Sequence, residues 1–548
     1  MAGPSIPSYN ALASGGSTFA PSSLHFDAAA GDETAAKRVT FTSTGPDAVT
    51  FGTASLGGTS PTSFNIVADT CSTHTFTSGQ TCYVDVTALL PTPGSQSATL
   101  NLTDDASGSH SVPLSATAIV GARGTYYPFL PQRIMDTRTG NGTTKAPIGS
   151  NGVRHLQVTG RGGVAATGVS AVVLNVTVVS PASSGYLTVY PTGVPRPTSS
   201  ALNFAKGWTG ANSVTVAVGT GGQIDIFNAS SSADVIVDVA GFFAANDSVL
   251  GGYGLGGQFQ SVYPERLFDS RYSGDGSRLD QDYFVSTPVD YGDENNSHIR
   301  AFAVNITAVS PLGSGYLTAW DGGDTFPSTS TLNFAAGKTV PNMAIVPAGP
   351  CYICEGDWYE KPSISIYTSQ ATHILVDIVG VFDDSSLEDG LRFTPITPTR
   401  IADTRTPLGL PGALGPNSTG VLTTPSSVIT EPDTSALALN VTAVNPTAST
   451  WLTVWPNGVE GLPQPTISSL NPAKGQTVPN AVITVIGPEE AFNIYNNAGT
   501  THVLIDVVGT FWLYPGTASS GFAGPGFGAK GPSQLRSVTT GGAVRHQR

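Results

Sequence analysis

Charged side chains are scarce in this chain. Asp, Glu, Lys and Arg make up only 11% of its 548 residues, and the acidic excess gives a formal charge of −14. Binding to nucleic acid or to an anionic membrane needs a basic face, whereas the 24 Lys and Arg residues are scattered. We therefore expect no nucleic-acid partner.

Long apolar runs are missing as well. No apolar stretch reaches the roughly 18 residues of a membrane-spanning helix, so we expect no membrane insertion. The first 20 residues contain neither the charges nor the apolar core of a secretory signal peptide, which indicates export by another route or a trimmed start.

Enzyme signatures are also absent. The chain has no G-x-S-x-G, H-E-x-x-H, P-loop or dinucleotide-binding motif, and its eight histidines are dispersed. The chain repeats one pattern three times, and no histidine recurs in all three copies. We predict a protein without catalysis and without a cofactor.

Cysteine is rare, and its four occurrences form two local pairs: Cys71 and Cys82, and Cys351 and Cys354. Even, local pairing favours disulfides and an oxidising destination. Cys351 and Cys354 form a C-x-x-C without a second pair at zinc spacing and without a thioredoxin-like setting, so a local disulfide is the favoured interpretation.

The composition of the chain is dominated by residues that favour turns and residues that favour strands. Gly, Pro, Ser and Thr are abundant, and short runs rich in Val and aromatics lie between them. No helical period lasts beyond a turn or two. This profile predicts an all-β fold.

The threefold pattern of β runs has a period of about 130 residues, which is the size of an independent domain and too long for a solenoid unit. Each copy opens with an arginine-containing strand, has an Asn-x-Thr strand at its centre and closes with an apolar strand that holds one Asp. In the first copy these are Arg133–Arg138, Leu174–Thr177 and Val235–Phe243. About eight strands in roughly 120 residues predict a β-sandwich or a compact barrel.

These features divide the chain into six parts. We expect an extended arm, an immunoglobulin-like domain, three homologous β modules and a Gly-rich basic tail, at residues 1–21, 22–120, 124–245, 254–384, 391–514 and 515–548. The basic tail on an acidic body is suited to docking on a neighbouring subunit, and a flexible solvated end is the alternative.

Residues 22–120 resemble a known family. Phe26, Val39–Ser43, Cys71, Gly79–Val86 and Pro113–Ala116 follow the order of the immunoglobulin-like domains of the ASPM, SPD-2 and Hydin type. The resemblance implies a seven-stranded sandwich in which Cys71 is bonded to Cys82. It also implies a docking or spacing role without an active site.

The three modules resemble a second family. An Asp-Thr-Arg start, a Leu-Asn-Val-Thr-Ala-Val centre and a Val-Asp-Val-x-Gly-Phe end are typical of a β repeat in large secreted or surface-exposed proteins of actinobacteria. The resemblance implies no established activity. The second module departs from the pattern at Ser270 and by an insertion over residues 351–361.

Each closing strand holds one acidic residue among Val, Ile and Leu. An unpaired buried carboxylate costs several kcal/mol, and arginine binds a carboxylate through two hydrogen bonds. We therefore predict structural ion pairs between these aspartates and the recurring arginines, in a cluster that extends to Asp136, Asp269 and Asp403. The predicted pairs are Arg138 with Asp238, Arg271 with Asp377, and Arg405 with Asp506.

Other interpretations of the same residues stay open. The aspartates of each copy also fit a calcium or magnesium site, although no Asp-x-Asp-x-Asp loop is present, or the carboxylate pair of a glycosidase. The Asn-x-Thr motif matches the N-glycosylation sequon. Strand alternation explains it without a glycan, because it places Asn and Thr on one face and apolar residues on the other.

Aromatic pairs recur four residues apart on one predicted strand, so that both rings lie on the same face. Such rows are suited to stacking on sugar rings or on a neighbouring subunit, although large aromatics more often pack inside a sandwich or between modules. A further candidate contact is an exposed tip beside the second cysteine pair, marked by Trp358 and Tyr359. The paired residues are Tyr186 and Tyr190, Tyr316 and Trp320, and Trp451 and Trp455.

The sequence therefore predicts a non-enzymatic structural or adhesion protein of an extracellular assembly. The favoured setting is the surface of a phage particle, as a capsid decoration, head fibre or tail protein, with other copies of the chain or other particle proteins as partners. The alternative is an actinobacterial cell-surface or filament protein that binds glycan through its strand aromatics. Three modules in one chain fit either a ring about a pseudo-threefold axis or a fibre.

Overall fold

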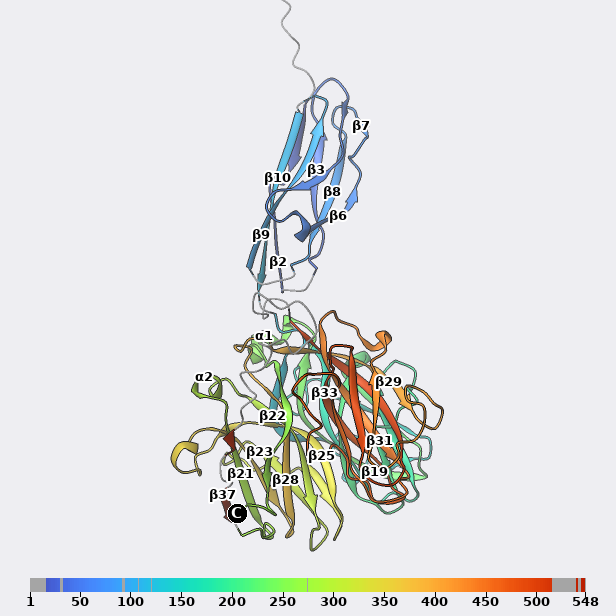
Figure 1. Cartoon of the computed structure of the whole chain (residues 1–548). Coiled ribbons are helices and arrows are strands. Elements are labelled where there is room, and N and C mark those ends of the chain that lie inside the picture. Colours follow the sequence, from blue (N-terminus) through green and yellow to red (C-terminus); the bar gives the residue numbers. More distant parts are fainter. Residues whose placement is uncertain are drawn as a thin grey trace, which may run out of the picture. The chain divides into compact units, whose positions relative to one another are not determined.

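The computed structural model describes residues 16–29, 33–90, 94–106, 108–119, 121–273, 275–514, 539–540 and 544–547. The chain divides into two compact units, residues 1–121 and 122–548. Nearly all described secondary structure is β-strand, which confirms the predicted all-β fold (Figure 1).

Helices are few and short in the described part of the chain. The α-helices α1 (Leu250–Tyr253) and α2 (Asp293–Asn296) are single turns. No helix among the described residues has the length and apolar character needed to cross a membrane. The 3-10 helices cover Pro61–Ser63, Thr220–Gly222, Asp247–Val249, Gly356–Trp358 and Ser426–Val428.

The first unit is a sandwich of two four-stranded sheets. One sheet runs in the order β1 (Ser17–Ala20), β3 (Lys37–Ser43), β8 (Thr81–Ala88) and β6 (Phe64–Asp69). The other runs in the order β2 (Leu24–Ala29), β10 (Gly108–Ile119), β9 (Gly94–Asp104) and β5 (Ser55–Gly57), and a small ribbon pairs β4 (Val49–Thr50) with β7 (Thr75–Phe76). A disulfide joins Cys71 to Cys82, as the sequence resemblance implied.

Residues 17–20, at the start of this sandwich, differ from the predicted extended arm. Residues 17–20 form the edge strand β1 on β3, because Phe19 supplies an apolar ring that packs on Phe41 with 5.8 Å between the ring centroids. The arm predicted for residues 1–21 is therefore wrong at its end. Residues 1–15 of that prediction lie outside the described residues.

The second unit contains three modules of one design, each with an inner sheet that faces the other modules and an outer sheet. The inner sheet of the first module has the order β11 (Tyr126–Asp136), β19 (Ser232–Ala244), β14 (Val169–Val179) and β17 (Gly210–Ala217), with β12 (Ile148–Gly149) beside β19. Its outer sheet has the order β13 (Val153–Gln157), β18 (Gln223–Asn228), β15 (Gly185–Pro191) and β16 (Leu202–Phe204).

The second and third modules repeat this order. In the second, the inner strands are β20 (Phe259–Asp269), β28 (His373–Phe382), β22 (Ala301–Val309) and β25 (Val340–Pro347), and the outer strands are β21 (Tyr283–Asp290), β27 (Pro362–Thr368), β23 (Gly315–Trp320) and β24 (Leu332–Phe334), with β26 (Gly349–Pro350) beside β27. In the third, the inner strands are β29 (Leu391–Asp403), β35 (His502–Leu513), β31 (Thr434–Val444) and β33 (Thr477–Val485), and the outer strands are β30 (Ser418–Thr423), β34 (Ala491–Asn496) and β32 (Leu452–Pro456).

The central inner strand of each module is buried on both faces. In β14, Leu174 and Val176 enter the module's own core, while Ala171 and Val173 enter a separate core shared by all three modules. The same alternation holds in β22 and β31, where Ala301, Ala303, Ala436 and Ala438 enter the shared core. Small residues on the shared face let the three inner sheets approach one another closely.

Six aromatic rings fill this shared core. Each module contributes one ring from its opening strand and one from the end of its closing strand, and each opening ring packs on the closing ring of the next module in a cyclic order. The three contacts are Tyr126 on Phe382, Phe259 on Phe511 and Phe393 on Phe243, with centroids 4.6, 4.8 and 4.3 Å apart. The modules therefore surround a pseudo-threefold axis and do not form a fibre.

Part of the tail adds to the second module. Strands β36 (Thr539–Thr540) and β37 (Val544–Gln547) pair antiparallel with β21, and they are the dark red arrows beside it in Figure 1. The rest of the tail predicted for residues 515–548 lies outside the described residues.

Candidate functional site

A ring of asparagines joins the three modules around the axis. The amide nitrogen of Asn175 donates to the carbonyl of Ser330 in the second module (2.6 Å), and its amide oxygen accepts from the side chain of Asn342 (3.1 Å). Asn342 in turn accepts from the backbone N–H of Ser213 in the first module (3.0 Å). The recurring Asn of the Asn-x-Thr motif is therefore an interface residue.

The same three bonds recur at the other two interfaces and close the ring. Asn305 bonds Ser468 and Asn480, and Asn440 bonds Ser200 and Asn212. The backbone N–H groups of Met343 and Ala481 complete the set. Because the amide nitrogens of Asn175, Asn305 and Asn440 are committed to these bonds, the sequon match is structural.

The threonines of the same motif also face the axis. Thr177, Thr307 and Thr442 are at most 3% exposed, and their hydroxyls have no hydrogen-bond partner among the described residues. Their recurrence in all three modules follows from the alternation that places Asn and Thr on the shared face.

The buried aspartates form ion pairs, but with arginines other than those predicted. Asp238 accepts two bonds from Arg133, at 2.9 and 3.3 Å, and is 1% exposed. Asp377 pairs with Arg266 in the same way, and Asp506 pairs with Arg400. The predicted pairs of Asp238 with Arg138, Asp377 with Arg271 and Asp506 with Arg405 are wrong.

Strand register explains the correction. Arg133 lies directly opposite Asp238 on paired strands, and Arg266 and Arg400 lie opposite Asp377 and Asp506 in the same way. The predicted arginines follow the end of the opening strand and bind the aspartate two residues earlier through two side-chain bonds each. These local pairs are Arg138 with Asp136, Arg271 with Asp269 and Arg405 with Asp403.

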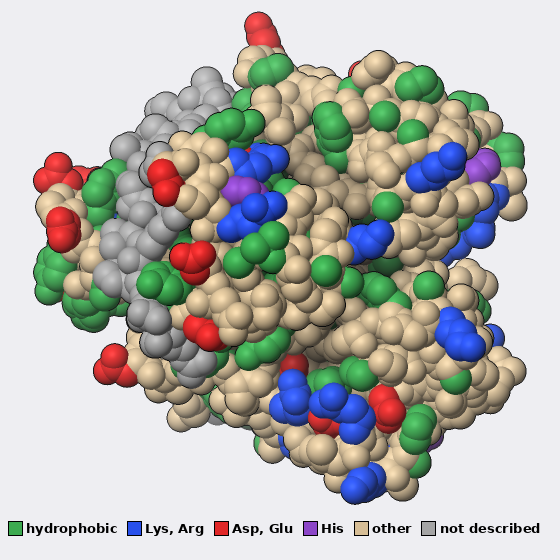
Figure 2. Space-filling view, turned by 90° about the horizontal axis from the view of Figure 1, so that it is seen from below, with side chains coloured by type: hydrophobic (Ala, Val, Ile, Leu, Met, Phe, Trp, Pro, Cys, Tyr) green, Lys and Arg blue, Asp and Glu red, His purple; other side chains and the backbone are tan. Residues whose placement is uncertain are grey.

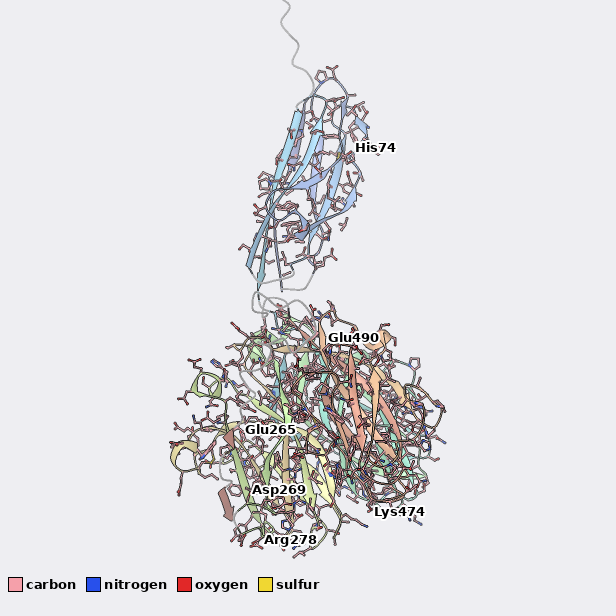
Figure 3. All side chains as sticks on the ribbon, in the orientation of Figure 1. His74, Glu265, Asp269, Arg278, Lys474 and Glu490 are labelled. Carbon is pink, nitrogen blue, oxygen red and sulfur yellow. A yellow bond between two sulfur atoms is a disulfide. The ribbon has the colours of Figure 1, made fainter. Side chains whose placement is uncertain are left out.

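The two kinds of pair differ in electrostatics. Burial raises the pKa of Asp377 to about 6, against the opposing hydrogen bonds from Arg266. Hydrogen bonds from Arg138 and Arg405 instead lower the pKa of Asp136 and Asp403. Asp269, labelled in Figure 3, also bridges its two arginines, since Arg266 lies 3.0 Å from it.

The arginine–aspartate clusters contribute to packing between and within the modules. Two of the buried carboxylates line a boundary between modules: Asp238 lies beside Ser330 and Asn342, and Asp506 lies beside Ser199 and Ser200. Among the described residues, no group of three or more His, Cys, Asp or Glu is placed to hold a metal ion. In each cluster the arginines are paired with the carboxylates.

The strand aromatics divide into an exposed and a buried set. The first member of each pair, Tyr186, Tyr316 or Trp451, is 37–41% exposed. The second member is at most 7% exposed, and between the two the hydroxyl of Thr188, Thr318 or Thr453 bonds a carbonyl of the segment that comes after the strand. That segment interrupts each row, so the described outer sheets have no continuous aromatic platform, and the buried second members pack inside the sandwich as the favoured interpretation predicted. The buried members are Tyr190, Trp320 and Trp455.

The insertion of the second module forms an aromatic tip. A disulfide joins Cys351 to Cys354, as predicted. Tyr352 and Tyr359 are more than half exposed, with ring centroids 6.1 Å apart, whereas Trp358 is half-buried. Lys361 fixes the base of the tip by ion pairs to Asp290 and Asp293.

Sequence reasoning missed the residues that join the modules: the six core rings, and Asn212, Asn342 and Asn480. One signal was available. The run at residues 171–174 is apolar on both faces, which is typical of a sheet buried on both sides.

Comparison with protein-family models gives no match to this chain, and comparison with curated proteins gives none either. Three solved structures show weak likeness. They are the secreted serine protease VesC from Vibrio cholerae (14% identity, TM-score 0.16), the Sulfolobus Turreted Icosahedral Virus (9%, 0.14), and the M60 catalytic domain with CBM51 domains of ZmpB from Clostridium perfringens (9%, 0.13).

These likenesses cover 39%, 68% and 92% of this chain, and 48%, 85% and 46% of the respective structures. The chain therefore spans about half the length of the first structure. Likeness at such low TM-scores supports no conclusion about function.

Proposed function

We propose that this chain is a non-enzymatic structural protein of an extracellular assembly, and specifically a component of a phage particle. The observation that carries the proposal is the closed pseudo-threefold ring. Three modules of one chain enclose six aromatic rings and a cycle of asparagine hydrogen bonds, as three subunits of a trimer do at their common axis.

The recurring chemistry of the modules supports a scaffold. The repeated Asn, Asp, Arg and Phe residues are engaged with one another within the modules and at their boundaries, so repetition of the motif accounts for assembly without an active site. The two disulfides suit an oxidising environment outside the cytoplasm. The proposed partners are other copies of the chain or other particle proteins.

Localisation on purified particles tests this function. An antibody raised against the full chain should decorate phage particles at a regular position in immunogold electron microscopy, and mass spectrometry of gradient-purified particles should detect the chain at a fixed ratio to the capsid protein. Recovery only in the cell-wall fraction of the host culture would contradict the particle assignment.

Glycan binding on a cell surface or particle surface is a second candidate. The observation in its favour is that each module presents one aromatic ring at the same position of its outer sheet: Tyr186, Tyr316 and Trp451. Binding of the full chain to purified cell-wall polysaccharide, with Trp451→Ala and Trp455→Ala as variants, tests this interpretation. Unchanged binding in both variants rejects the strand aromatics as the contact.

A further inference from the structure

A cleft of about 440 Å³ opens at one end of the pseudo-threefold axis. Ala211, Pro341 and Pro479, one from each module, form part of its lining, and each comes directly before an asparagine of the interface ring. The cleft therefore begins where the ring ends. Its volume falls within the range of roughly 300–1,000 Å³ that small-molecule sites occupy.

The cleft opens on the face seen from below. Lys474 lies at the lower end of the second unit in Figure 3 and directly precedes Gly475 and Gln476, which line the cleft. The space-filling view from below shows furrows between the lobes of this unit (Figure 2).

The first module departs from the repeat at this cleft. The turn glycines Gly207, Gly337 and Gly475 occupy equivalent positions in the three modules. They are followed by Trp208, Lys338 and Gln476, so only the first module has an aromatic ring there. Trp208 is half-buried and packs against the edge of the first module's core.

A matching glycine accommodates this tryptophan. A Cβ atom at Gly210 would lie 2.0–2.6 Å from atoms of the Trp208 indole, so the ring lies directly against the Gly210 backbone. The other modules have Val340 and Val478 at this position, and neither carries the tryptophan. The other two modules form the same fold without this pair, so the fold of the module does not require Trp208 and Gly210.

The remaining lining combines a second ring with amide groups. Tyr186 is 37% exposed, and the cleft also contains Asn203, Asn471 and Gln476. Each of these three amides accepts one bond through its oxygen, and their amide nitrogens make no hydrogen bond among the described residues. None of the described residues that line the cleft is Asp, Glu, Lys or Arg.

We infer that this cleft binds a neutral carbohydrate. Aromatic faces suit the apolar C–H face of a pyranose ring, amide N–H groups suit its hydroxyls, and a lining without charged side chains disfavours an ionic ligand. Trp208 and Tyr186 supply the stacking surface, and Asn203 and Gln476 supply donors from two modules. This inference rests on glycan binding, the second candidate function, and places it at the axis, in a cleft lined by all three modules.

Titration of the full chain with neutral oligosaccharides tests the site. The probes are maltohexaose, cellohexaose, xylohexaose and chitotetraose, followed by isothermal calorimetry and by tryptophan fluorescence. At least one probe should bind, and Trp208→Ala should weaken its binding at least tenfold. Tyr272→Ala is the matched control, because it removes an exposed ring that belongs neither to the cleft nor to the strand aromatics, and the probe should bind this variant within twofold of the wild type. Trp451→Ala reports separately on the strand aromatics.

The possible outcomes separate the site from the function. Loss of binding in Trp208→Ala but not in Trp451→Ala supports the cleft. The reverse pattern overturns the cleft while leaving glycan binding in place at the strand aromatics, and absence of binding by every probe overturns both. Because Trp208 also packs against the module core, Trp208→Phe, which retains a stacking ring, should keep most of the affinity, and thermal unfolding verifies that each variant is folded.

Discussion

In the second unit, the three modules have the same residues and contacts at the axis but differ from one another at the outer rim. At the axis the three modules place equivalent residues in equivalent contacts, such as Asn175, Asn305 and Asn440. Away from these contacts they differ: within the described residues, the second module alone has the cysteine-bearing tip and the paired tail at the rim, and the first alone has Trp208 in the cleft at the end of the axis. The recurring residues build the scaffold, so we expect recognition where the three copies differ.

The largest expected effect is at the aromatic core. Phe511→Ala should lower the free energy of unfolding by about 3–5 kcal/mol, because the ring is 1% exposed and its removal leaves a cavity among packed rings. Tyr316→Ala, at the rim, should lower it by less than about 1 kcal/mol. Denaturant unfolding measures both, and equal effects would remove the distinction between axis and rim.

The two kinds of ion pair come next. Arg400→Met should destabilise the chain by about 3 kcal/mol, because it leaves the carboxylate of Asp506 buried without its partner. Arg405→Met should have an effect below about 1 kcal/mol, since its side chain is 47% exposed where it pairs with Asp403. A larger loss in Arg405→Met than in Arg400→Met would contradict the observed pairing.

The asparagine ring should respond less strongly. Asn305→Ala removes the bonds to Ser468 and Asn480 and should cost about 2 kcal/mol. Asn333→Ala, in the outer sheet, removes a single bond from Ser330 and should cost under about 1 kcal/mol. Equal denaturation midpoints for the two variants would show that the bonds of the asparagine ring stabilise the fold no more than a single bond in the outer sheet.

Buried Asp377 makes stability depend on pH. Its pKa of about 6 in the folded chain lies above the ordinary value of 3.8, so the folded state binds the proton more tightly. Stability from this group is therefore present at pH below 3.8 and is lost as pH rises through about 6. The wild type should gain about 1 kcal/mol between pH 7 and pH 5 relative to Asp377→Asn, and parallel curves would contradict the raised pKa.

The smallest expected effect concerns the tail. Deleting residues 539–548 should change the free energy of unfolding by less than about 1 kcal/mol, because few backbone bonds are lost. Hydrogen exchange should nevertheless rise in β21, which pairs with the tail strands, and stay unchanged in β13 and β30 of the other modules. Unchanged exchange in β21 would show that the tail does not cover it.

The sequence predicted much of the local structure, because turn residues and strand alternation are local signals. It predicted the all-β fold and the disulfides from Cys71 to Cys82 and from Cys351 to Cys354. It also predicted arginine partners for the buried aspartates. The choice of partner failed because irregularities in the pairing of the opening strand set which arginine faces Asp238.

The sequence patterns did not identify the residues at the module interfaces. Whether Phe243 fills its own module or a shared core depends on where the neighbouring modules sit, which is a property of the whole chain. The same holds for the cleft beside Trp208, since its lining comes from three modules far apart in the sequence.

We expect the three modules to behave as one cooperative ring, because their repeated residues join them around the axis. Hydrogen exchange followed by mass spectrometry on full-length Phe511→Ala tests it most directly. If the ring is one unit, exchange should rise together in β14, β22 and β31, the central inner strands of all three modules. An increase confined to the third module would contradict the claim.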